Sequence, residues 1–159
     1  MSARERVPSD DAAGRRFCIV AAQWNERFVR RLVDGAVATL LARGAAEADV
    51  EVRWVPGSLE LPWAANLVCG GGQAPHAVIA VGCVIRGETE HFRLVADNAA
   101  AGLARVAIER GVPVLNGVLA VEDAEQAEAR CGGEHGNTGA QAALAAVRCA
   151  NLAASRWAS

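Results

Sequence analysis

Residues 77–92, AVIAVGCVIRGETEHF, decide the fold of this chain, because an apolar run of strand length leads into a polar corner that ends in a histidine. The run up to residue 84 contains a single non-apolar residue, Gly82. Such a run predicts a strand buried on both faces, as in the centre of a parallel sheet. The corner from Arg86 to His91 follows the carboxyl end of this strand, where open α/β sheets bind ligands. We therefore expect the functional site at this corner.

Other segments of the chain alternate between strand and helix patterns. The further predicted strands are residues 17–22, 50–55 and 112–120. The predicted helices follow Asn25 up to Gly44 and then cover residues 58–68, 89–110, 123–131 and 138–153. This alternation predicts an α/β fold, a three-layer α/β/α sandwich on a four-stranded parallel sheet. The alternating apolar and polar residues of segment 50–55 indicate a strand at the sheet edge.

Polar residues predict where three of the helices begin. Asn25, Ser58 and Thr89 are suited to the N-cap position, where a side-chain oxygen accepts a hydrogen bond from a helix N–H. The apolar spacing of the helix over residues 89–110 predicts that Leu94 faces inward, together with later apolar positions.

Composition limits the classes of function. The 159 residues are 52% hydrophobic with a net charge of −2, which fits one domain with a sizeable core. We divide the chain into a polar N-terminal extension, residues 1–14, and a single domain, residues 15–159. All 16 basic residues are scattered arginines, which argues against a nucleic-acid-binding patch. Without lysine, no side-chain amine is present to form a Schiff base.

The extension and the cysteines indicate the compartment. The extension lacks the apolar core of a signal peptide, and no segment approaches the ~20 apolar residues of a membrane helix. We therefore expect a cytoplasmic protein without membrane contact. The five cysteines are an odd number, widely spaced and without a CxxC pair, so we expect buried free thiols and no metal site.

Polar or aromatic residues follow three of the predicted strands. Trp24 and Asn25 follow the first, residues 58–60 follow the second, and residues 86–91 follow the third. Because the carboxyl ends of parallel strands lie on one side, we expect these corners to form a pocket. Trp24 is suited to stacking on a flat ligand, although packing within the protein is an equally good explanation.

Spacing alone leaves the roles of the charged candidates open. An imidazole such as that of His91 is suited to proton transfer, but a lone histidine at a helix start is more often structural. Arg130 is suited to binding an anion, or to compensating the dipole at the end of a short helix. Taken alone, Glu60 is better explained as a favourable charge at a helix start than as a ligand-binding residue.

Four motifs in this order resemble lumazine synthase. They are QWN at 23–25, PGSLELP at 56–62, GCVIRGETEHF at 82–92 and GNTG at 136–139. The resemblance covers residues 17–152 and implies a flavodoxin-like fold. It implies the condensation of 5-amino-6-ribitylaminouracil with 3,4-dihydroxy-2-butanone 4-phosphate to 6,7-dimethyl-8-ribityllumazine, phosphate and water. This is the penultimate step of riboflavin biosynthesis and needs no metal and no cofactor.

The resemblance also implies the site residues. His91 takes the place of the proton-transfer residue. The pyrimidine and the ribityl chain are assigned to Trp24, Asn25, Ser58, Leu59, Glu60, Cys83, Val84, Ile85 and Asn116. The phosphate is assigned to Gly87, Glu88, Thr89 and Arg130. A helix start, with its free N–H groups, is physically suited to this anion.

The family further implies a homo-oligomer, a pentamer or multiples of it up to an icosahedral capsid. Its active site is shared between adjacent subunits, and riboflavin synthase is a candidate partner. Two positions depart from the family pattern: Asn116 replaces a phenylalanine of many members, and Thr138 replaces a lysine. They motivate the alternative of a weakly active or inactive flavin- or lumazine-binding shell protein. A third hypothesis, an electron carrier, lacks a phosphate loop after the first strand.

Overall fold

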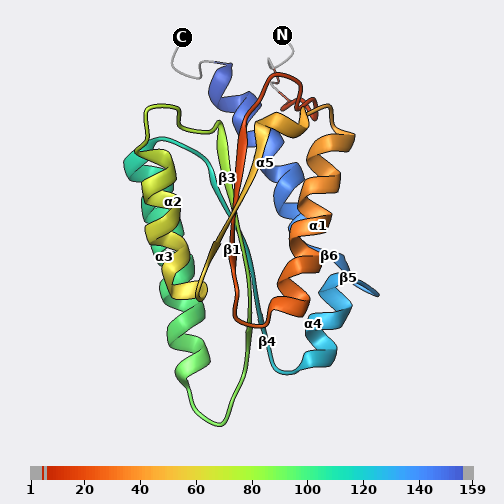
Figure 1. Cartoon of the computed structure of the whole chain (residues 1–159), viewed down its shortest axis with the longest axis vertical. Coiled ribbons are helices and arrows are strands. Elements are labelled where there is room, and N and C mark those ends of the chain that lie inside the picture. Colours follow the sequence, from red (N-terminus) through yellow and green to blue (C-terminus); the bar gives the residue numbers. More distant parts are fainter. Residues whose placement is uncertain (1–4, 6, 156–159) are drawn as a thin grey trace.

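A four-stranded parallel sheet forms the centre of the computed structural model, which describes residue 5 and residues 7–155 (Figure 1). The strand order is β2-β1-β3-β4. The strands are β1 (Phe17–Ala22), β2 (Val50–Val55), β3 (Ala77–Ile85) and β4 (Val114–Val121). The apolar run forms β3, which pairs with β1 on one side and β4 on the other, so its predicted central place is confirmed. The predicted edge position of β2 is also confirmed.

Helices cover both faces of this sheet (Figure 1). On one face lie α1 (Glu26–Ala42), α4 (Ala124–Arg130) and α5 (Thr138–Ala154). On the other lie α2 (Leu61–Cys69) and α3 (His91–Arg110). The predicted three-layer sandwich is therefore confirmed. Within the described ranges, no helix combines the length and apolar character needed to cross a membrane.

Short elements complete the described chain. Two 3-10 helices, Glu47–Asp49 and Ser58–Glu60, flank β2. A small antiparallel hairpin joins β5 (Cys131–Gly133) to β6 (Gly136–Asn137). The sequence did not predict this hairpin, because its glycines have the composition of a loop and its strands are too short for a pattern.

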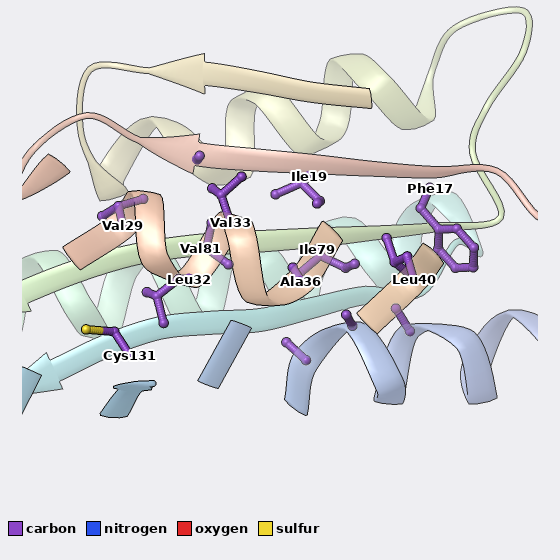
Figure 2. Packing of buried hydrophobic residues seen from close by; sticks show 14 of the residues in the cluster. Phe17, Ile19, Val29, Leu32, Val33, Ala36, Leu40, Ile79, Val81 and Cys131 are labelled. Carbon is purple, nitrogen blue, oxygen red and sulfur yellow. The ribbon is translucent and has the colours of Figure 1, made fainter. Parts of the chain in front are cut away.

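Two apolar clusters pack against the two faces of the sheet. Figure 2 shows the larger one, which includes Ile79 and Val81 of β3 and Leu32 of α1. The smaller one joins β1 to α2 and α3 and includes Leu61 and Leu103. Since successive strand residues point to opposite faces and both faces are covered, a continuous apolar run suits the central strands.

Four cysteines are buried as free thiols, as predicted: Cys18, Cys69, Cys83 and Cys131. Cys149 is half-buried. Burial raises the pKa of Cys18 and of Cys83 to about 12. A thiol protonated at neutral pH is a poor nucleophile, so these side chains serve packing.

Several predicted details of the helices are wrong. Ser58 does not cap α2, because it opens a 3-10 turn and α2 begins only at Leu61. The third long helix begins at His91, whose backbone N–H donates to the hydroxyl of Thr89 at 3.3 Å. Leu94 is 61% exposed, so it does not face inward as predicted.

The last residues of the N-terminal extension pack against the domain. Ala12 is fully buried in the larger cluster, and its N–H donates to the carbonyl of Arg43 at 2.8 Å. Arg148 of α5 donates to Asp10 from Nε at 2.6 Å and from Nη2 at 3.2 Å. This hydrogen bond holds the pKa of Asp10 below its usual value. The segment therefore joins the ends of α1 and α5 that lie away from the carboxyl ends of the strands (Figure 1).

Helices α1 and α5 approach each other closely at Gly139. A methyl group placed on Gly139 would lie 2.0 Å from the carbonyl oxygen of Leu32 and 2.9 Å from its Cα. Because a backbone must move to admit it, we expect Gly139→Ala to lower the free energy of unfolding by about 1–3 kcal/mol. Chemical denaturation at fixed protein concentration measures this loss. In the control, Gly72→Ala, the added methyl meets nothing within 4 Å. Equal stability of the two variants would contradict the close approach.

Candidate active site

A cleft of about 470 Å³ opens at the carboxyl ends of β1, β2 and β3. Its walls come from the β1–α1 turn, the segment between β2 and α2, the end of β3 and the start of α3. The lining residues are Trp24, Asn25, Pro56, Gly57, Ser58, Leu59, Glu60, Cys83, Val84, Ile85, Gly87, Thr89, His91, Phe92 and Val95. The three strand ends singled out in the sequence thus surround one cleft.

Three of the candidate residues do not line this cleft. Glu88 is exposed on the turn before α3. Asn116 lies on the edge strand β4, where its Oδ1 accepts a hydrogen bond from the N–H of Val118 at 3.0 Å. Arg130 ends α4 and donates to the carbonyl of Gln126 at 3.1 Å. A single chain therefore does not bring Asn116 and Arg130 to the cleft.

Trp24 has a fixed backbone and a free ring. The N–H of Gln23 donates to Val55 at 2.8 Å, and the N–H of Trp24 donates to Pro56 at 3.2 Å. The indole side is open, since Trp24 is 75% exposed. Packing within the chain does not explain this residue. Its ring is placed as a surface on which a flat ligand can stack.

Asn25 joins the β1–α1 turn to β3. It is the only non-glycine residue with positive φ in the described part of the chain, at φ 60° and ψ 40°, a region that asparagine tolerates. Pairing of β1 with β3 ends at Ala21 and Val81. Beyond that point the Asn25 Nδ2 donates to the carbonyl of Cys83 at 2.8 Å. The prediction that its side chain caps α1 is wrong: no N–H of α1 donates to the Asn25 side chain, whose amide is held toward β3 by the bond to Cys83.

Gly82 makes room for Ser58 at the cleft. A methyl group on Gly82 would lie 2.6 Å from the Ser58 Oγ, and Ser58 is only 5% exposed. The single glycine in the apolar run is explained by this approach, since a side chain there would displace the segment. Glu60 turns back toward the same loop: a methyl on Gly57 would lie 3.0 Å from its Oε2.

The start of α3 presents an imidazole beside a helix N-terminus. His91 is the first residue of α3, is exposed and lines the cleft. The first N–H groups of a helix lack partners within it and favour an anion. Nothing lies within 4 Å of a methyl placed on Gly87, so a ligand can approach that backbone closely.

Sequence reasoning missed the apolar wall of the cleft. Phe92 and Val95 line it from α3, and Pro56 lines it from the opposite side. Helical spacing held a signal for Val95, because it lies four residues after His91 and therefore on the same face. No comparable pattern singles out Phe92.

Comparison with known proteins decides the family. The sequence model of 6,7-dimethyl-8-ribityllumazine synthase matches residues 14–154. The chain belongs to this family. Lumazine synthases of Xanthomonas campestris pv. campestris strain B100 and Stenotrophomonas maltophilia strain R551-3 are each 54% identical to it, over 86% of this chain and 88% of theirs. The enzyme of Xanthomonas oryzae pv. oryzae strain PXO99A is 53% identical over the same shares. The resemblance of the four motifs to lumazine synthase is confirmed.

Proposed function

We propose that this chain condenses 5-amino-6-ribitylaminouracil with 3,4-dihydroxy-2-butanone 4-phosphate to 6,7-dimethyl-8-ribityllumazine, phosphate and water. This is the penultimate step of riboflavin biosynthesis. The observation that carries the proposal is the geometry of the cleft in a chain of this family. One wall of the cleft holds an exposed indole, and another holds an imidazole at a helix N-terminus. These groups suit a flat pyrimidine and a phosphorylated partner that must react beside each other.

The reaction needs proton transfers and closely held substrates. The amine of the pyrimidine adds to the ketone carbon, and loss of water leaves an imine. Phosphate then departs, and the ribityl-bearing amine closes the second ring with loss of water. Holding the two substrates in contact raises their effective concentration. His91 moves protons in these steps, and none of them calls for a lysine on the enzyme.

The pyrimidine half of the cleft is assigned by shape and polarity. Trp24 stacks on the ring, and residues 58–60 contact the ribityl chain and the ring edge. Backbone groups of residues 83–85 line the pyrimidine. The Cys83 carbonyl already accepts the Asn25 amide, which leaves it one lone pair for the substrate.

The phosphate half of the cleft combines the turn before α3 with an arginine from a neighbouring subunit. Gly87, Glu88 and Thr89 present backbone N–H groups, and Arg130 supplies a guanidinium. Arg130 and Asn116 lie away from the cleft of their own chain, which supports a site shared between adjacent subunits. We infer a cytoplasmic homo-oligomer, a pentamer or multiples of it up to a capsid, that passes its product to riboflavin synthase.

Product formation tests the proposed activity. The purified protein is incubated with both substrates, and lumazine absorbance and phosphate release are followed together. Equal amounts of the two products, with none when either substrate is omitted, are expected. Binding of the lumazine without turnover would indicate instead the inactive shell protein, which the named relatives do not favour.

Arg130→Ala is expected to raise the KM for the phosphorylated butanone about tenfold or more, because the lost guanidinium fork binds phosphate oxygens. The KM for the pyrimidine should change little. Steady-state kinetics with each substrate varied in turn measure both constants. Arg105→Ala, which removes an exposed arginine that forms an ion pair with Glu109, is the control. An equal rise of both KM values would contradict the assignment.

A further inference from the structure

Arg86 connects the two ends of the turn that precedes α3. Its backbone N–H donates to the carbonyl of Val121, the last residue of β4, at 2.9 Å. Its Nη1 donates to Glu122 at 3.2 Å, and its Nη2 lies 3.7 Å from Glu90. Glu122 follows β4, whereas Glu90 directly precedes α3. One guanidinium therefore ties the end of the sheet to the start of the helix.

The same guanidinium reaches the wall of the cleft. It lies over the ring of Phe92 at 5.4 Å, a distance at which a cation is attracted to the face of an aromatic ring. Phe92 lines the cleft beside His91. Glu90 is held from its other side as well, because Arg93 Nε lies 3.3 Å from its second oxygen.

The turn itself, residues 87–90, has little support of its own. All four residues are exposed, and a side chain on Gly87 would meet nothing. Each ion pair of Arg86 is exposed and weak when taken singly. A planar guanidinium that satisfies three partners at once nevertheless fixes their relative positions, which a single ammonium does not.

We propose that Arg86 is a positioning residue, which holds the phosphate-binding turn and His91 in place through Glu90, Glu122 and Phe92. This inference rests on the proposed function of the turn and names a residue outside the cleft lining. The competing explanation is that Arg86 contributes only positive charge near the phosphate. The two explanations differ in what they expect of Glu122.

Neutralising Glu122 separates positioning from charge. Glu122→Gln removes a negative charge from the neighbourhood of an anion site, so charge alone predicts a lower KM for the phosphorylated butanone. Positioning predicts a higher KM, because the guanidinium of Arg86 loses its ion pair with the residue that follows β4. Arg86→Lys extends the test. Charge alone predicts a wild-type KM for the phosphorylated butanone, whereas positioning predicts a KM as high as that of Arg86→Gln.

Steady-state kinetics of Arg86→Gln, Arg86→Lys and Glu122→Gln provide the first measurement. We expect Arg86→Gln to raise the KM for the phosphorylated butanone roughly three- to tenfold, with the KM for the pyrimidine near its wild-type value. Arg105→Gln is the matched control. It breaks an exposed ion pair with Glu109, 2.7 Å long, which lies within α3 and away from the turn. A lowered KM in Glu122→Gln, or wild-type behaviour of Arg86→Lys, overturns the proposal.

Hydrogen exchange provides a second measurement that does not depend on turnover. Amides in residues 87–94 should exchange faster in Arg86→Gln and Glu122→Gln than in the wild type, and should be unchanged in Arg105→Gln. If the wild type forms no lumazine while the exchange rates differ in this way, the proposed function fails and the positioning role stands. Unchanged exchange in Arg86→Gln overturns the positioning role, whatever the activity of the wild type.

Discussion

Replacing His91 with alanine is expected to lower kcat by roughly 10²–10⁴-fold, the usual contribution of a group that transfers protons in the transition state. The KM for the ribitylaminouracil should stay close to that of the wild type. In the proposed site the pyrimidine is held by Trp24 and residues 58–60, whose positions come from other elements of the fold. His91 is exposed at the first position of α3, so its removal leaves no buried cavity.

Steady-state kinetics of His91→Ala, with each substrate varied, measure both constants. His135→Ala is the control, because His135 is also exposed but lies outside the cleft. Added imidazole should restore part of the activity of His91→Ala. It should leave the activity of His135→Ala unchanged. Unchanged kcat with a raised KM would make His91 a binding residue only.

Coexpression of His91→Ala and Arg130→Ala chains is expected to restore activity. If adjacent subunits share each site, one subunit supplies His91 and its neighbour supplies Arg130. With equal amounts and random mixing around a closed ring, roughly a quarter of the interfaces pair two intact residues. At a low concentration of the phosphorylated butanone, the mixed oligomers should form lumazine much faster than either parent variant alone.

Mixed oligomers must be verified for this experiment, for example with two different affinity tags and sequential purification. The control combines the separately purified parents without unfolding, where slow exchange of subunits should give little recovery. Mixed oligomers no more active than the average of the parents would show that each site lies within one chain.

The sequence predicted the layers of the fold because the strongest pattern coincided with burial. The apolar run of β3 is covered on both faces, and the alternation of β2 reflects its place at the edge. Side-chain hydrogen bonds at the helix starts were less predictable, because a polar side chain has distant as well as local partners. Asn25 has the chemistry of an N-cap, but a carbonyl 58 residues away accepts its amide. No local pattern reports such an acceptor.

The candidate site was predicted in part for similar reasons. Topology was enough to bring Trp24, Ser58 and His91 to one end of the sheet. It did not decide whether Trp24 packs or remains open, because its exposure depends on how Pro56 and Val55 hold the turn. Asn116 was named through the family resemblance alone, whereas Arg130 was also a candidate from its charge. Their places on β4 and at the end of α4, away from the cleft, were not predicted from the local sequence.

The position of the far ends of α1 and α5 has a practical consequence. The segment around Asp10 and Ala12 is joined to Arg43 and Arg148 at the end of the sheet opposite the cleft (Figure 1). The six residues of β1 alone span about 20 Å between these two ends. A resin linker or a fluorescent reporter joined before residue 7 or after residue 155 starts from the end away from the mouth of the cleft. Immobilised enzyme prepared in this way leaves the entrance for both substrates unobstructed within each chain.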